Sequence, residues 1–486
     1  MVAEIIQNVI RKNVVRMIVN YASNASNERL VQMTHLAEKL TREEETRRKI
    51  QQLRRHFETG HPAVELGKEI ITTLSPACKK KLIENFFVNA GITGNAIRQK
   101  IYEKDGYRPP FFLLISPTMR CNLNCIGCST REFDKKTDMP FEVLDNLMVQ
   151  AKRMGMYFVT TLGGEMFVYD DIWKLWEKHN DCYFQVYTNG TLIDDKAAHT
   201  LSELGNVAPM ISVEGYKEET DWRRGKGVWD KVMSAMDRLH KEGVLYGASV
   251  TQTSKNSDIV TSEEFVDFLI SKGCRVLWYF QYIPIGKNPD LSLMPSPEQR
   301  DKLRKMILEL RSKKPIFFGD FWNDGPYVKG CIAGGRQYLH INNRGDVEPC
   351  GFVHFATDNI NRTPLAEALQ SPFFREVRKN QQAYTSLKPY APHTGDYMCP
   401  NMLTPCMIID QPWVLREAVK KTGAYATQDG DMELLSGERA EFLDTYSKRM
   451  HEIYDAVWAT DEYKKHKDSL RRRREKFLEE QKIKVA

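Results

Sequence analysis

The feature that most constrains the fold is a regular alternation of apolar runs and helical patterns between residues 108 and 320. Six runs have the apolar, aromatic and β-branched side chains of strands: Phe111–Ser116, Phe158–Leu162, Tyr183–Tyr187, Pro209–Val213, Ala248–Thr251 and Val276–Ile283. The helical patterns are Phe141–Met154, Asp171–His179, Asp194–Leu204, Val228–Lys241, Ser262–Lys272 and Ser296–Arg311. Strands that alternate with helices form parallel sheets with crossover helices.

This pattern predicts an α/β protein built on a partial (β/α)6 TIM-type barrel, because a full barrel has eight such repeats. We expect an N-terminal helical region over residues 1–107 and the barrel over 108–325. A loop-rich, cysteine-containing auxiliary domain is expected over 326–425, and a helical, basic C-terminal tail over 426–486.

The composition is that of an ordinary soluble protein, and the net charge of +6 is small for 486 residues. No run approaches the length of a membrane-spanning helix, and no secretory signal is visible. Clustered cysteines in such a chain favour metal binding over disulfides. We therefore expect a cytoplasmic protein, and we expect no nucleic-acid partner.

Three cysteines follow the first predicted strand: Cys121, Cys125 and Cys128, spaced C-x3-C-x2-C. Three thiolates can hold three irons of a 4Fe–4S cluster and leave the fourth iron open to a small molecule, whereas an electron-carrying cluster normally has four cysteines. A structural zinc site would need a fourth ligand nearby, and the next cysteine is Cys182. Because reactive sites of parallel β/α folds lie at the carboxyl ends of strands, the triplet predicts a catalytic cluster.

Further motifs follow the later strands in order. They are Gly163-Gly164-Glu165, Thr188-Asn189-Gly190, Ser212 with Glu214, Arg223-Arg224 and Tyr282-Ile283-Pro284. Together with the cysteine triplet, they resemble the radical S-adenosylmethionine (SAM) enzymes over roughly residues 108–320. In that family SAM chelates the open iron, and its reductive cleavage gives a 5′-deoxyadenosyl radical that abstracts hydrogen from a substrate.

The resemblance implies cofactor contacts. Gly163 and Gly164 would let backbone carbonyls approach the methionyl ammonium, and Glu165 would pair with it. Asn189 either contacts SAM or caps the following helix. Two positions depart from the usual pattern: Met166 stands where a proline is common, and Gly127 where many relatives carry an aromatic side chain against adenine.

The same resemblance places the rest of SAM on later strands. Ser212 and Glu214 would bind the ribose, and Arg224 the carboxylate, with Arg223 beside it as an alternative. The backbone at Ile283 would read the adenine edge.

Cys331 and Cys350 flank Gly345 in C-x13-G-x4-C, and Cys399 and Cys406 come later. This spacing resembles the start of SPASM or twitch domains and implies one auxiliary 4Fe–4S cluster with four cysteine ligands. Structural zinc on the same ligands is the alternative, and His340 or His354 could replace one thiolate. The other cysteines, Cys78, Cys182 and Cys274, have the character of buried thiols.

The segment 317–327, FFGDFWNDGPY, has two interpretations. Asp320, Asn323 and Asp324 could bind substrate or relay protons, or they could hold a structural loop. The sequence alone does not decide between these two roles.

The sequence thus predicts a radical SAM enzyme that activates a C–H bond and receives electrons from a flavodoxin- or ferredoxin-type reductant. A non-catalytic iron–sulfur carrier or scaffold is the alternative. The substrate is a small molecule, a lipid or isoprenoid chain, or a peptide side chain. The amphipathic first helix (residues 1–22) either packs on the protein or lies on a membrane surface. The membrane alternative, together with the basic tail that contains Arg471–Arg474, favours the lipid and a peripheral contact with the inner membrane face.

Overall fold

The computed structural model describes Met17 and residues 25–40, 44–131, 133, 136–381 and 401–468. Apart from Met17, the predicted first helix lies outside these residues, as do the basic run Arg471–Arg474 and Cys399. None of the described helices is long and apolar enough to cross a membrane.

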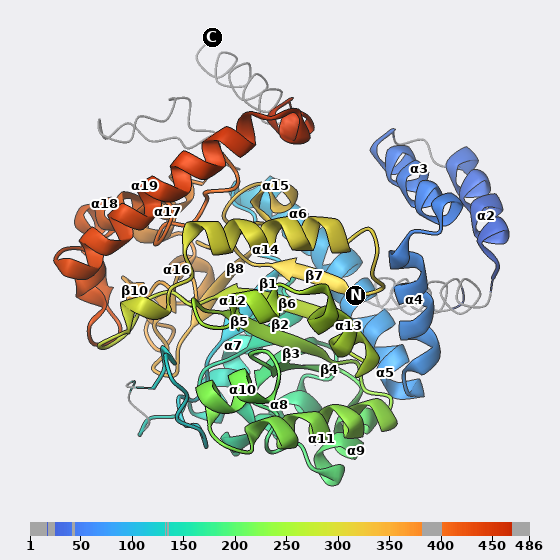
Figure 1. Cartoon of the computed structure of the whole chain (residues 1–486), viewed down its shortest axis with the longest axis horizontal. Coiled ribbons are helices and arrows are strands. Elements are labelled where there is room, and N and C mark those ends of the chain that lie inside the picture. The colour runs from blue at the N-terminus through green and yellow to red at the C-terminus, as the bar shows by residue number, and fades with distance from the viewer. Residues whose placement is uncertain are drawn as a thin grey trace.

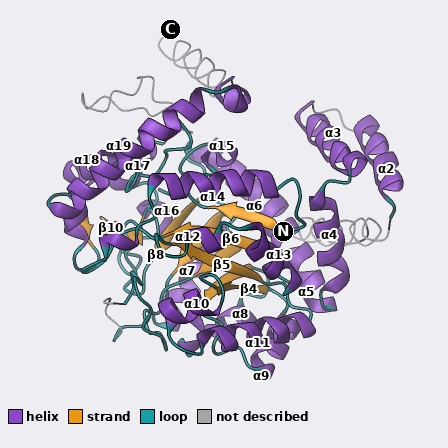
Figure 2. Cartoon of the chain, in the orientation of Figure 1, coloured by secondary structure: helices purple, strands orange, loops and turns teal. Residues whose placement is uncertain are grey.

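A parallel sheet forms the centre of the molecule, with helices packed around it (Figures 1 and 2). Its first seven strands neighbour one another in chain order. They are β1 (Phe112–Ile115), β2 (Phe158–Thr161), β3 (Tyr183–Thr188), β4 (Val207–Ser212), β5 (Gly247–Gln252), β6 (Val276–Gln281) and β7 (Phe317–Asp320). The six predicted strands are confirmed, and β7 is a seventh that the sequence reading assigned to a loop.

Six helices between the strands follow the predicted boundaries closely. They are α7 (Phe141–Arg153), α8 (Ile172–Lys178), α9 (Asp195–Leu204), α11 (Val228–Lys241), α13 (Glu263–Ser271) and α14 (Pro297–Leu310). Their starts are set by side chains that accept free backbone N–H groups: Asp194 for α9, Ser262 for α13 and Ser296 for α14. The sequence did not predict α10 (Lys217–Arg224), α12 (Ser257–Val260) or the short 3-10 turns at Met166–Val168 and Leu291–Leu293.

The sheet continues past β1 with strands from the cysteine-containing region. Strand β8 (Tyr338–Ile341) pairs in parallel with β1, so that Leu114 lies opposite His340. Strand β9 (Val347–Glu348) then pairs antiparallel with β8. The auxiliary region therefore supplies two strands to the barrel sheet, which the sequence reading did not predict.

The N-terminal region is helical, as predicted. Its elements are α2 (Asn27–Leu40), α3 (Glu44–Thr59), α4 (Pro62–Thr73), α5 (Pro76–Lys81), a π-helical segment (Leu82–Thr93) and α6 (Gly94–Asp105). Asn85 and Asn89 donate side-chain hydrogen bonds to backbone carbonyls at the loop before β3, and Arg98 donates to the carbonyl of Gly155 at 2.5 Å. These bonds fasten the region to the barrel.

The C-terminal part packs beside β6, β7 and α14. It contains α15 (Gly325–Val328), α16 (Leu365–Ala368), α17 (Pro372–Lys379), α18 (Pro412–Thr422), α19 (Glu438–Ala459), the small pair β10 (Phe355–Ala356) and β11 (Tyr425–Ala426), and 3-10 turns at Asp431–Leu434 and Asp461–Tyr463. The fully buried Arg300 of α14 joins it to the barrel: its guanidinium pairs with Asp410 at 2.5 Å and also donates to Asn323 and Leu403.

Asp410→Asn should destabilise the protein strongly, because it leaves the buried Arg300 charge without a counter-charge. Breaking one side of a buried ion pair costs about 3–5 kcal/mol. A urea or thermal unfolding curve measures the change. Glu309→Gln, which breaks the exposed Lys313–Glu309 pair, is the matched control and should cost under about 1 kcal/mol. Equal stability of the two variants would contradict this account of the interface.

Candidate active site at the carboxyl ends of the strands

The cysteine triplet lies on the loop after β1, and all three thiols line one cavity of about 340 Å³. The Leu123 N–H donates to Cys121 Sγ at 3.4 Å, and Cys128 Sγ lies 3.3 Å from the Thr130 hydroxyl. Burial raises the pKa of Cys121 and of Cys125, so these groups favour the neutral thiol. A bound cation would be needed to hold them as thiolates.

The glycine pair after β2 fits tightly against the cysteine loop. A Cβ on Gly164 would lie 2.0 Å from the Arg120 carbonyl oxygen, and one on Gly163 would lie 2.3 Å from that of Thr118. The Gly164 N–H donates to Thr118, and the next N–H donates to Arg120. Both glycines line the cavity, and the absence of side chains lets the loop pack directly on the end of β2.

Glu165 is fully buried and does not line the cavity. Its carboxylate accepts from the Thr188 hydroxyl at 2.7 Å, the Asn189 N–H at 2.7 Å and the Phe167 N–H at 3.1 Å. Burial raises the pKa of Glu165, and these donors oppose that shift. The side chain therefore ties the end of β2 to the end of β3. The contact of Glu165 with the SAM ammonium stays a prediction.

Asn189 lies beside the cysteine loop and lines the cavity. Its amide donates to Asn122 at 2.8 Å and approaches Cys121 Sγ at 3.8 Å, while its oxygen accepts from the Thr191 N–H. The alternative role as helix cap is wrong, because Asp194 caps α9.

Two arginines after β4 share one acidic partner. Glu214 is buried and pairs with Arg223 at 2.7 Å and with Arg224 at hydrogen-bonding distance. Burial works against the charge on Arg224, but Glu214 and Cys125 hold the pKa of Arg224 above its usual value. Ser212 and both arginines line the cavity. Glu214 does not line it, and its Oε2 has no hydrogen-bond donor within the described chain.

The ring of Tyr282, the residue directly after β6, fills the space beside Gly127. Gly127 has φ +67°, and a Cβ there would lie 2.9 Å from the ring of Tyr282. Tyr282 and Ile283 are buried and line the cavity. An aromatic ring therefore lies next to the third cysteine although the sequence carries glycine before it.

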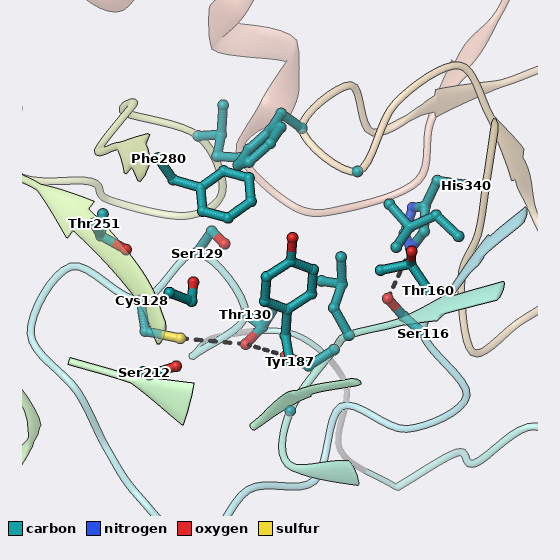
Figure 3. A pocket seen from close by; sticks show the side chains of 18 of the residues that line it. Ser116, Cys128, Ser129, Thr130, Thr160, Tyr187, Ser212, Thr251, Phe280 and His340 are labelled. Carbon is teal, nitrogen blue, oxygen red and sulfur yellow. Dashed lines mark hydrogen bonds between the residues drawn. The ribbon is translucent and has the colours of Figure 1, made fainter. Parts of the chain in front are cut away.

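The interior of the cavity is built from alternate residues of the strands, whose side chains point inward. Aromatic walls come from Phe112, Phe158, Tyr187, Trp278 and Phe280, and polar groups from Ser116, Thr160, Gln185, Ser249 and Thr251. Figure 3 shows Cys128 and Ser212 on one side, Ser116 and His340 on the other, and the Tyr187 ring between them. The sequence analysis missed the aromatic walls and the polar strand residues Ser116, Thr160, Gln185, Ser249 and Thr251, although alternation within the strands could have indicated which side chains face inward.

A second cavity of about 160 Å³ lies between β6, β7 and the auxiliary region, and three of the later cysteines line it: Cys331, Cys350 and Cys406. Burial raises the pKa of all three, to about 12 for Cys406. The Tyr338 hydroxyl lies 2.8 Å from Cys350 Sγ. Five residues line both cavities and are called the shared wall: Trp278, Phe321, Ile332, Tyr338 and Phe352.

The two histidines considered as substitute ligands lie on the first cavity instead. His340 pairs with Glu348 at 2.5 Å, and His354 pairs with Asp431 at 2.6 Å. The lone thiols Cys78, Cys182 and Cys274 are buried in the barrel core. No three His, Cys, Asp or Glu side chains within the described ranges converge on a single metal ion.

The 317–327 segment has a structural network. Asp324 pairs with Arg311 at 2.7 Å, and Asn323 accepts from Arg300 at 3.0 Å. Asp320 accepts from the backbone and side chain of Asn323, and burial with neighbouring Asp324 raises the pKa of Asp320 to about 6. Asp320 and Asp324 line the second cavity, not the first.

Comparison with known proteins settles the class. A sequence profile of the radical SAM superfamily matches residues 115–259, and one of the SPASM iron–sulfur cluster-binding domain matches residues 331–389. The chain therefore carries a radical SAM domain and a SPASM domain. These domains imply a radical SAM enzyme, with a 4Fe–4S cluster and SAM in the first domain and further iron–sulfur binding in the SPASM domain.

Three similar proteins illustrate the range of relatives. The mycofactocin maturase MftC of Mycolicibacterium smegmatis is 28% identical over 299 residues, 57% of this chain and 75% of its own length. The Fe-coproporphyrin III synthase of Methanosarcina barkeri is 25% identical over 224 residues, 43% of this chain and 56% of its own. The structure of anSMEcpe with bound AdoMet and Cp18Cys peptide matches with a TM-score of 0.50 at 19% identity, covering 72% of this chain and 100% of the other. The last match supports the fold.

The residues present fit these cofactors. Three thiols on one loop face the cavity that Ser212, Arg224 and Ile283 also line, and the Arg224 guanidinium there suits a carboxylate such as that of SAM. Three thiols, those of the buried Cys350 and the partly buried Cys331 and Cys406, line the second cavity, and Cys399 would be the fourth ligand by sequence.

Gly164→Ala should disturb the cysteine loop, since a Cβ 2.0 Å from the Arg120 oxygen forces main chain apart. We expect a loss of about 1–3 kcal/mol in unfolding free energy and a lower iron content after anaerobic reconstitution. Gly67→Ala is the control, because its Cβ meets nothing within 4 Å. Full iron content and unchanged stability of Gly164→Ala would show that the loop does not depend on this contact.

The buried His354–Asp431 pair predicts a pH dependence of stability. The Asp431 carboxylate overcomes the effect of burial and raises the pKa of His354 to about 9. A folded pKa above the usual 6.5 stabilises the native state fully below about pH 6.5, and the benefit disappears as pH rises through 9. The stability difference between wild type and His354→Gln, on the order of 3 kcal/mol at pH 6, should therefore shrink toward pH 10 in thermal unfolding. A difference independent of pH would contradict the charged pair.

Proposed function

We propose that this enzyme cleaves SAM reductively at a cluster held by Cys121, Cys125 and Cys128, and that it modifies a peptide side chain at an unactivated C–H bond. The bound cluster and SAM supply the electron and the 5′-deoxyadenosyl radical for this chemistry. The observation that carries the proposal is the joint lining of one cavity by the three thiols and by Ser212, Arg224 and Ile283.

The chain's own residues hold the cysteine loop, orient SAM and shield the reaction space from water. Gly163 and Gly164 hold the cysteine loop on β2, and Asn189 fixes the loop next to Cys121. Arg224 offers a guanidinium to the SAM carboxylate, while Glu214 keeps that guanidinium charged and in place. The aromatic walls exclude water from the space where a radical would react.

The interior lining favours a peptide over a lipid. Thr160, Gln185, Ser249 and Thr251 face the cavity, and a plain hydrocarbon chain would leave such polar groups without partners. A peptide combines apolar side chains with backbone donors and acceptors. The anSMEcpe structure carries a bound peptide. The helix and tail that favoured a lipid lie outside the described residues.

Cys125→Ala should abolish SAM cleavage, because one of three iron ligands is lost. The measurement is 5′-deoxyadenosine formed from SAM by the anaerobically reconstituted, dithionite-reduced protein. Cys78→Ala, a buried thiol far from the cavity lining, is the control and should keep the wild-type rate. Undiminished product from Cys125→Ala would refute the assignment of this loop.

The substrate class has its own test. Pooled peptides from a proteolytic digest of host proteins should raise 5′-deoxyadenosine formation above the substrate-free rate, and an extract of host lipids should not. Stimulation by the lipid extract alone would overturn the peptide proposal.

A further inference from the structure

A serine, a histidine and a glutamate form a continuous hydrogen-bonded chain at the wall of the first cavity. Ser116 follows β1, and His340 lies on the neighbouring strand β8. The Ser116 Oγ is 2.7 Å from His340 Nε2, and both residues are buried and line the cavity (Figure 3). His340 Nδ1 is 2.5 Å from the Glu348 carboxylate on β9, directly across the strand pair.

The surroundings of Glu348 fix the direction of these hydrogen bonds. Besides His340, the Glu348 carboxylate accepts from the Asn342 amide at 3.0 Å and from the Thr427 hydroxyl. We assign Glu348 the acceptor role toward all three partners, so His340 Nδ1 carries the hydrogen and donates it. In the neutral ring Nε2 then holds a lone pair, and the Ser116 hydroxyl donates to it.

The second histidine of the cavity has the opposite arrangement. His354 Nδ1 pairs with Asp431, and its Nε2 lies 3.2 Å from the carbonyl oxygen of Gly351, which can only accept. Both nitrogens of His354 face acceptors, so at neutral pH the ring is an imidazolium with no lone pair to offer. Of the two cavity histidines, only His340 can take up a proton.

We propose that Ser116, His340 and Glu348 form an acid–base relay that removes a proton from the bound substrate; this rests on the proposed function. The substrate would present an ionisable N–H or O–H group to Ser116 Oγ. As that proton moves to Ser116, the hydroxyl proton of Ser116 moves to His340 Nε2, and Glu348 stabilises the imidazolium. At each transfer one bond to hydrogen breaks and another forms, and no group is oxidised or reduced.

The relay also assigns a role to the SPASM segment. His340 and Glu348 lie on β8 and β9, within the matched residues 331–389, yet they face the cavity of the radical SAM domain. The segment therefore completes the substrate wall with acid–base chemistry in addition to its cysteines. A purely structural network would fasten β8 to β1 equally well, so the test must detect proton movement.

Phenylmethanesulfonyl fluoride probes this directly. If His340 accepts the Ser116 proton, Ser116 Oγ attacks the sulfonyl group, fluoride leaves and a stable sulfonyl-serine forms. Anaerobic holoenzyme without SAM is treated with the reagent, and peptide mass spectrometry locates the adduct. We expect modification of Ser116 in wild type, none in Ser116→Ala, and a rate at least ~100-fold lower in His340→Gln. His199→Gln, at an exposed histidine outside the cavity lining, is the matched control and should keep the wild-type rate.

Unmodified Ser116 in wild-type protein with full iron content would overturn the relay, and so would equal rates in wild type and His340→Gln. Nitrogen NMR of protein labelled with ¹⁵N-histidine covers the case in which His340→Gln does not fold. It should show a ring protonated at Nδ1 whose Nε2 signal shifts in Ser116→Ala, and protonation at Nε2 of that ring would contradict the proposal. Absence of 5′-deoxyadenosine formation in wild type would instead remove the radical chemistry and leave the labelling result standing.

Discussion

The pairing of β1 on both of its edges is the constraint on which the rest of the structure depends. On one edge β1 pairs with β2, whose glycine pair receives the cysteine loop. On the other edge it pairs with β8, which brings in residues more than 200 positions later in the chain. Main-chain hydrogen bonds fix this register, and a slip of one residue would turn His340 away from Ser116 and from the cavity.

Much of the barrel could be predicted from the sequence because its signals are local. Apolar periodicity placed six helices closely, and the structure shows side-chain caps at Asp194 and Ser296 where two of them begin. The seventh strand escaped because Phe317–Asp320 is short, contains glycine and continues into a polar loop. Strand β8 escaped for a different reason: its parallel partner β1 is far away in sequence, and no local pattern reveals a long-range pairing.

The candidate site also combines features that local sequence signals predict with features that depend on long-range packing. Cysteine spacing and strand-end position indicated a common location for Cys121, Gly163, Ser212 and Arg224, and these residues do line one cavity. The orientation of the Glu165 and Glu214 side chains could not be predicted from motif spacing. Glu165 and Glu214 are occupied by neighbouring backbone and arginine donors, which depends on how the ends of β2, β3 and β4 pack together. The pairing of Ser116 with His340 depends on β8 and was invisible for the same reason.

Because the shared wall borders both cavities, the two cavities cannot change independently during evolution. Trp278, Phe321, Ile332, Tyr338 and Phe352 contact both hollows, so any replacement that reshapes the substrate space also alters the surroundings of the later cysteines. New specificity is therefore more easily acquired on the opposite side, where Thr160 and Gln185 border only the first hollow. Divergence among enzymes of this architecture should then concentrate on β2 and β3, while the partition between the chambers changes slowly.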